Sequence, residues 1–226
     1  MKSQVRGGTR WKRFAVVMVP SVAATAAIGV GLAQGALAAS FSISGQEFKV
    51  KAESLVGEGF VQYGSIASGK TLGDETFVAP VAVSGFNKAW ITNMCQSVVT
   101  PKVPFIGDVT LQLKAGTADN KPVYAEGLYL DVSSLKADAE FEKIDIGVAA
   151  GSANKDLKGD VLPGRPGIQS GIDPRTVNQN GFAQRAEKAK LTGVEQKAWA
   201  TTAATFKLPN LSLSLHRGTS AECFKD

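Results

Sequence analysis

The sequence has a single histidine, His216, and it has no Gly-x-Ser-x-Gly segment. A Ser–His–Asp triad needs a histidine as its base, and an α/β-hydrolase presents its serine on a Gly-x-Ser-x-Gly turn between a strand and a helix. His216 comes directly after an alternating Leu/Ser stretch and just before Gly218, a setting typical of an exposed turn residue. We therefore predict no catalytic set, and no sequence motif predicts a cofactor.

Cysteine is scarce as well, since Cys95 and Cys223 are the whole complement. One histidine and two cysteines are too few side chains for a zinc site of the usual composition. In an oxidising compartment the two cysteines most simply form a disulfide, and two free thiols are the alternative. The bridge would close a loop of more than 100 residues, which the chain-entropy model makes worth about 4–5 kcal/mol.

Acidic residues are missing from the start of the chain, where the first one is Glu47. The formal net charge of +5 equals the charge of the five basic residues that precede Phe14. They are Lys2, Arg6, Arg10, Lys12 and Arg13. The rest of the chain is balanced and has no basic run, whereas a surface for nucleic acid needs clustered lysine and arginine. We therefore predict no nucleic-acid partner.

A long apolar stretch, residues 14–37, follows these basic residues and ends in Ala36-Leu37-Ala38 before Ala39. Small residues at these positions favour cleavage by a signal peptidase. A helix that stays in the membrane needs about 20 apolar residues, and the stretch is long enough for that too. Residues 1–38 are thus predicted to be a signal peptide or an N-terminal anchor helix. We therefore expect the chain to be exported, to the extracellular space or to the outer face of the cytoplasmic membrane.

Short runs in which apolar and polar residues alternate dominate the chain after residue 39. Examples are residues 109–113, 128–132 and 211–215. A period of two is typical of strands with one buried face. Helical spacing is clearest at residues 181–190, where Phe182, Ala186 and Ala189 share one face. We predict one mainly β domain over residues 39–226, with a short helix at 181–190.

A weak repeat of the form apolar-x-apolar-x-x-apolar-x-apolar runs through these stretches. At the centre of the repeat, two residues instead of one separate the apolar positions, and we call this point the parity shift. In a regular strand the apolar side chains after this point would therefore lie on the exposed face. A β-bulge or a corner restores the buried side, and glycine and asparagine tolerate positive φ there. The residues at the shift are Asn93, Gly127, Lys143, Gly193 and Asn210.

Two architectures fit this repeat. The first is a curved antiparallel sheet or a sandwich whose long strands are bulged, and the second is a β-solenoid with one rung per repeat. Chance matches in a chain rich in valine, alanine and glycine are a third explanation. A Cys95–Cys223 bridge favours the compact sheet, because the C-terminus must then return to the middle of the chain. Residues 151–179 have little periodicity and several prolines and glycines, and they are predicted to form a long surface loop.

Three segments resemble an actinobacterial family of exported proteins of unknown function. They are residues 3–15 (SQVRGGTRWKRFA), 92–97 (TNMCQS) and 197–202 (KAWATT). Proteins of this family are alike over nearly the whole chain, and many carry the label "cholesterol esterase". Their genes tend to lie beside one for a small multispanning membrane protein. The resemblance therefore implies a membrane-protein partner, but it brings no active-site residues with it.

Two classes of function follow. The first is a non-enzymatic protein of the cell envelope or extracellular space that binds a membrane partner or an apolar ligand. Balanced charge and the missing nucleophile turn favour this class, since apolar concave surfaces are the usual ligand sites. The second is a hydrolase of lipid or sterol esters, as the label of the family suggests.

Overall fold

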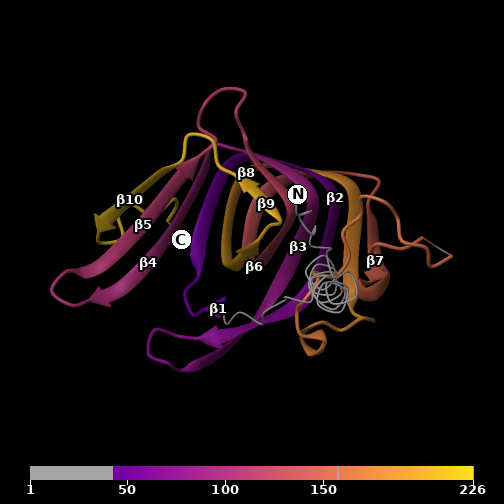
Figure 1. Cartoon of the computed structure of the whole chain (residues 1–226), viewed down its shortest axis with the longest axis horizontal. Coiled ribbons are helices and arrows are strands. Elements are labelled where there is room, and N and C mark those ends of the chain that lie inside the picture. The colour runs from indigo at the N-terminus through magenta and orange to yellow at the C-terminus, as the bar shows by residue number, and fades with distance from the viewer. Residues whose placement is uncertain (1–42, 157, 226) are drawn as a thin grey trace, which may run out of the picture. The chain divides into compact units, whose positions relative to one another are not determined.

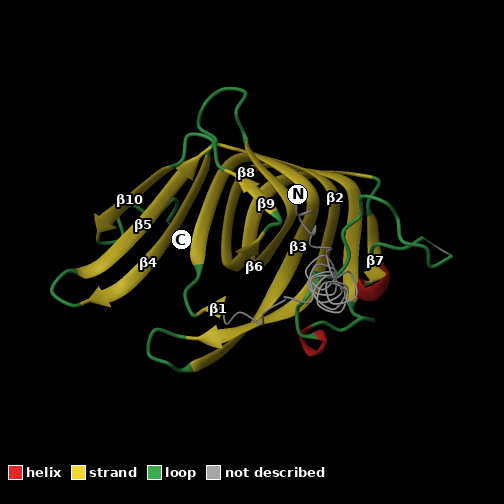
Figure 2. Cartoon of the chain, viewed as in Figure 1, coloured by secondary structure: helices red, strands yellow, loops and turns green. Residues whose placement is uncertain are grey.

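The computed structural model describes residues 43–156 and 158–225, and within them it contains strands and two short 3-10 helices. The strands are β1 (Ile43–Ser44), β2 (Phe48–Lys70), β3 (Thr76–Thr92), β4 (Met94–Val103), β5 (Gly107–Ala115), β6 (Val123–Glu142), β7 (Asp145–Ala149), β8 (Phe182–Thr202), β9 (Thr205–Lys207) and β10 (Ser212–Arg217). The 3-10 helices are η1 (Ala150–Ser152) and η2 (Pro174–Thr176). The predicted mainly β fold is confirmed, and Figure 2 shows how little of the described chain is helical.

Four long strands close on themselves. β2 pairs with β3, β3 with β6, β6 with β8, and β8 again with β2, and all four pairings are antiparallel. We call this closed set of β2, β3, β6 and β8 the ring, and its strands curve strongly in Figure 1. The curved antiparallel sheet is therefore the architecture that the chain adopts, rather than a solenoid.

The sheet continues outside the ring as a second region. β4 pairs with the first residues of β2, β5 pairs with β4, and β10 pairs with β5. We call β4, β5 and β10 the wing, which lies to one side of the ring in Figure 1. β10 is the last strand of the sheet on this side, so one of its edges has no neighbouring strand among the described residues.

The long strands bend at residues with positive φ. All five residues at the parity shift of the sequence repeat have this conformation. The φ angles are 49° at Asn93, 57° at Gly127, 52° at Lys143, 61° at Gly193 and 54° at Asn210. Gly59 of β2, which the repeat did not include, shares it with a φ of 61°. A left-handed residue changes the direction of a strand and lets the flanking apolar residues face the same side.

At Asn93 this change is a corner without an inserted residue. The pairing of β2 continues in register past it, from Thr92 opposite Ser54 to Cys95 opposite Lys51. The side-chain amide of Asn93 donates a hydrogen bond to the carboxylate of Glu53 across the pair. The corner thus leaves the ladder intact and only redirects the chain from the ring into the wing.

Two apolar clusters lie on opposite sides of the ring strands. The first is inside the ring and takes in Phe60, Phe86 and Leu130. The second is outside and takes in Val61, Tyr63 and Val83 of β2 and β3. Residues 150–181, between β7 and β8, cover this outer cluster with side chains that include Val177. The segment predicted as a surface loop at 151–179 therefore contributes core contacts.

The helix predicted at 181–190 is wrong, because residues 182–190 belong to strand β8. Of the three residues predicted to share a helix face, Ala186 and Ala189 are buried but Phe182 is 65 % exposed. Ala183 is buried instead, and the spacing of three residues between these buried alanines imitates a helix. The spacing arises because β8 passes Lys143, which has positive φ, in the pairing with β6 and β7. Within the described residues, no helix has the length and apolar character needed to cross a membrane.

Candidate functional site

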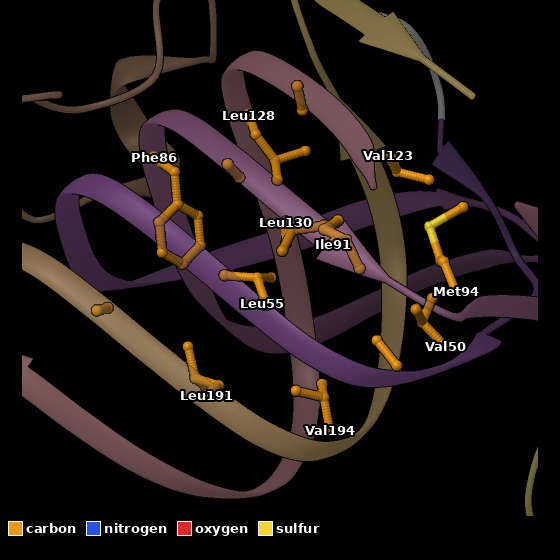
Figure 3. Packing of buried hydrophobic residues seen from close by; sticks show 14 of the residues in the cluster. Val50, Leu55, Phe86, Ile91, Met94, Val123, Leu128, Leu130, Leu191 and Val194 are labelled. Carbon is orange, nitrogen blue, oxygen red and sulfur yellow. The ribbon is translucent and has the colours of Figure 1, made fainter. Parts of the chain in front are cut away.

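The ring encloses a cavity of about 210 Å³. Ten of its fourteen lining residues are apolar, and the other four are Gln62, Ser84, Gln184 and Gln196. Figure 3 shows Leu55, Phe86, Leu130, Leu191 and Val194 pointing into the space between the curved strands, and all five line this cavity. A second cavity of about 30 Å³ shares Leu55, Leu130, Val194 and Gln196 with it.

The second half of β6 forms the entrance to the larger cavity. Leu135, Ala137, Ala139 and Phe141 alternate along this strand and all line the cavity. Leu135 is 41 % exposed and Ala139 is also exposed, so this wall reaches solvent. Ala137 and Ala139 are small, so they leave space in this wall that larger side chains would fill.

The polar groups in the cavity are all uncharged. Gln184 donates a hydrogen bond of 2.6 Å from Nε2 to Oε1 of Gln62, and Gln62 donates one of 2.9 Å from Nε2 to Oγ of Ser84. Ser84 is 4 % exposed and Gln196 is 5 % exposed. The lining contains no lysine, arginine, histidine, aspartate or glutamate. Apolar walls with a few fixed polar groups are typical of small-molecule sites.

Ionisable groups with shifted pKa lie instead on the outer face of the ring. Burial raises the pKa of Tyr63 and of Tyr129, and it also raises the pKa of Asp131. The tyrosines anchor the segment over the outer cluster: Tyr63 Oη accepts from the backbone N–H of Gln169 at 2.9 Å, and Tyr129 Oη donates to the carbonyl of Gly167 at 3.2 Å. These contacts are structural and do not converge on an open site.

The predicted disulfide between Cys95 and Cys223 is confirmed, with the two Cα atoms 5.8 Å apart. It fixes the C-terminal tail, residues 218–225, to the wing. The tail also accepts hydrogen bonds from Thr110 Oγ1 at the carbonyl of Gly218 and from Gln112 Nε2 at the carbonyl of Ala221, both 2.6 Å long. One face of the wing is therefore covered.

His216 lies in β10 on an exposed position of the wing. Its Nε2 is 2.9 Å from Oγ of Ser214, two residues earlier on the same face of the strand. Within the described chain no carboxylate holds the imidazole, although the base of a serine hydrolase is oriented by such a group. The contact is thus a Ser–His pair on a sheet edge, away from the cavity lining.

The remaining predicted site residues occupy other places. Ala36, Ala38 and Ala39 lie outside the described residues. Asn93 and Gly193 lie at corners of β3–β4 and β8, and neither lines the cavity. Sequence reasoning missed the four polar residues of the cavity. They could have been found as polar residues at positions where the alternating pattern predicts a buried side chain. Gln196, between Val194 and Ala198, is an example.

The family model that matches this chain covers residues 44–224, so it includes the ring, the wing and both cysteines. The chain belongs to DUF6230, a family of unknown function. The match spans nearly all of the residues that the structure describes. No curated protein and no solved structure has significant similarity to the chain.

Proposed function

We propose that this protein is a non-enzymatic binding protein of the cell envelope or extracellular space, and that it holds an apolar ligand in the cavity of the ring. The cavity itself supports the proposal. An engineered apolar cavity of about 150 Å³ is known to stay dry and to bind benzene. The ring cavity, at about 210 Å³, is larger and is also predominantly apolar. Because the wall formed by β6 reaches solvent, a ligand that excludes water from the apolar lining gains favourable contacts there.

Toluene is a suitable probe of this site, because it is apolar and close to benzene in size. Saturation-transfer NMR on the purified protein is expected to show toluene binding, with a dissociation constant of about 1 mM or below. The variant Ala139→Trp fills the entrance and is expected to abolish the signal. Ser134→Trp is the matched control, since Ser134 is exposed on the same strand and does not line the cavity.

A second measurement is designed to identify the natural ligand. Protein purified from its own producing cells is extracted with organic solvent, and the extract is analysed by mass spectrometry against an extract of Ala139→Trp. A compound present with the first protein and missing from the second supports the proposal. Toluene that binds to Ala139→Trp as well as to the unmodified chain would show that the cavity is not the site.

Export is part of the proposal. The basic residues and the apolar stretch before Ala39 favour it, and a disulfide is typical of an oxidising compartment. N-terminal sequencing of the secreted and the membrane-bound fractions separates the two forms. A mature chain that starts near Ala39 indicates a cleaved signal peptide, an intact N-terminus in the membrane fraction indicates an anchor, and an intact chain in the cytoplasm contradicts export.

Hydrolysis of lipid or sterol esters is the second candidate, and the contact between Ser214 and His216 is the observation in its favour. The pair lacks an orienting carboxylate among the described residues and lies on an exposed strand rather than in the cavity. A fluorophosphonate probe tests it directly. Labelling of Ser214 that disappears in His216→Ala would replace the binding proposal by an enzymatic one, and we expect no labelling.

A further inference from the structure

Gln196 is the most unusual residue of the cavity. It lies in β8 opposite Val50 of β2 and Leu135 of β6, and it lines both cavities. The residue is only 5 % exposed. Among the described residues no side-chain hydrogen bond to Gln196 is found, and its amide is not one of the fully buried groups without a partner, so the amide faces the open space of the cavity. Buried amides in native proteins nearly always have a hydrogen-bond partner, because leaving one without is costly.

Ser84 has a similar property on β3. It accepts the hydrogen bond from Gln62 through Oγ, so its own hydroxyl hydrogen is available for another acceptor. The hydrogen bond from Gln184 fixes the amide of Gln62, so that Nε2 of Gln62 donates to Ser84. Ser84 and Gln196 thus supply, to one apolar cavity, a hydroxyl donor and an amide that can both donate and accept.

The charge of the lining restricts what these groups can hold. A carboxylate or an ammonium group would lose its hydration in the cavity and would meet no opposite charge there. An uncharged hydroxyl or carbonyl group needs only the neutral donors and acceptors that are present. A pure hydrocarbon would leave the amide of Gln196 buried without a partner.

We infer that the ring cavity takes an uncharged, largely apolar molecule whose hydroxyl or carbonyl group binds to Gln196 and Ser84. The molecule is thus of the class of neutral alcohols, ketones and esters, and free fatty acids and amines are excluded. This inference rests on the proposed function, because it assumes that the cavity is the ligand site. A cavity somewhat larger than one that holds benzene accommodates one ring or a chain of about that bulk.

Three probes with the same ring test the inference: toluene, benzyl alcohol and benzoate. Their dissociation constants are measured by titration calorimetry or ligand-observed NMR at pH 7. Benzyl alcohol is expected to bind about 3- to 10-fold more tightly than toluene, which is the value of one net hydrogen bond between neutral groups. Benzoate is expected not to bind at the highest concentration used.

Two variants assign the hydrogen bond to its residues. Gln196→Met keeps the length of the side chain and removes the amide. The affinity of this variant for benzyl alcohol should therefore be as low as its affinity for toluene, and its affinity for toluene should not decrease. Ser84→Ala should lower the affinity for benzyl alcohol by a similar or smaller factor. Ala139→Trp should block both neutral probes, since it closes the entrance.

The outcomes separate this inference from the proposed function. Equal affinities for toluene and benzyl alcohol, unchanged in Gln196→Met and Ser84→Ala, overturn the inference and leave the proposed function in place. Benzoate that binds as tightly as benzyl alcohol also overturns it. Failure of every probe to bind to the unmodified protein contradicts the proposed function itself. If Gln196→Met does not fold, the ranking of the three probes and Ser84→Ala still decide.

Discussion

The ring and the wing are parts of one sheet, but different forces hold them. Each strand of the ring has a hydrogen-bonded neighbour on both sides over part of its length, and the ring surrounds its own apolar cluster. The wing ends at β10, which has no neighbouring strand on one edge among the described residues, and Leu211, Leu213 and Leu215 are exposed there. Closure therefore stabilises the ring, whereas the wing depends on what covers its faces.

The C-terminal tail supplies that cover on one face. It binds to the wing through the Cys95–Cys223 bridge and through a hydrogen bond of 3.0 Å from the N–H of Cys223 to Oγ of Ser97. An ion pair of 3.0 Å between Glu222 and Lys49 of β2 also links the tail to the ring. Ser97 is buried beneath it. A three-stranded extension has too little core to stabilise itself, so a covalent link compensates for the missing apolar burial.

A pair of leucine substitutions tests this comparison and should give the largest effect. Leu128 of the ring is 0 % exposed and belongs to the inner cluster, while Leu215 of the wing is 68 % exposed. Leu128→Ala should lower the free energy of unfolding by about 2–5 kcal/mol, and Leu215→Ala should change it by less than about 0.5 kcal/mol. Guanidinium unfolding with the disulfide intact measures both. Equal losses would mean that the wing leucine is buried in solution.

Removal of the disulfide should weaken the wing and spare the ring. The double variant Cys95→Ala/Cys223→Ala opens a link between residues 128 apart and should cost about 2–4 kcal/mol. Amide hydrogen exchange should become faster in β5, β10 and the tail, and should stay slow in the ring core.

Ser97→Ala is the control for this variant. It removes the hydrogen bond to the N–H of Cys223 but keeps the bridge, so the loss should be about 1 kcal/mol. Intact-mass analysis with and without reductant verifies the bridge in each sample. Equal acceleration of exchange in the ring and the wing would show that the two regions unfold as one.

The corners of the strands are a third point of comparison, because they are where the ring gains its curvature. Gly193 has a φ of 61° and open space around the position of a Cβ atom, so Gly193→Ala should lose about 1–2 kcal/mol from backbone strain alone. Gly64→Ala is matched to it, because Gly64 also has open space but does not have positive φ. This control should be neutral or slightly stabilising.

Gly193→Asn adds a test of the cause, since asparagine tolerates the left-handed region better than alanine. Thermal unfolding of the three variants measures the order, with Gly193→Ala lowest. If Gly64→Ala loses as much as Gly193→Ala, the strain at positive φ is not the reason for glycine at this corner.

Much of the fold could be predicted from local patterns. Alternation in residues such as Leu128 and Leu130 indicates strands, and the parity shifts fall on residues that have positive φ in the structure. The pairing of β2 with β8 could not be predicted, because it joins residues about 145 apart and local periodicity contains no information on partners. The cavity depends on that closure, so Ser84 and Gln196 could be recognised as parts of one cavity lining only in the folded chain.

Asp131 gives the smallest expected effect and tests the outer face of the ring. It lies in β6, two residues after Tyr129, which contacts the segment over the outer cluster, and burial raises the pKa of Asp131 above the ordinary value of an aspartate. The folded state therefore binds a proton more tightly than the unfolded state. At neutral pH the side chain is ionised in both states, and its partial desolvation destabilises the fold. This destabilisation decreases as the pH falls through the raised pKa toward about 3.9, the value in the unfolded chain.

Asp131→Asn should thus increase the free energy of unfolding at pH 7 by less than about 1 kcal/mol, and the gain should shrink as the pH approaches 4. Urea unfolding of both proteins from pH 4 to pH 8 measures the difference. A gain that is constant over this range would show that the carboxylate is not desolvated, and that the cover over the outer face of the ring is looser than the contacts of Tyr63 and Tyr129 indicate.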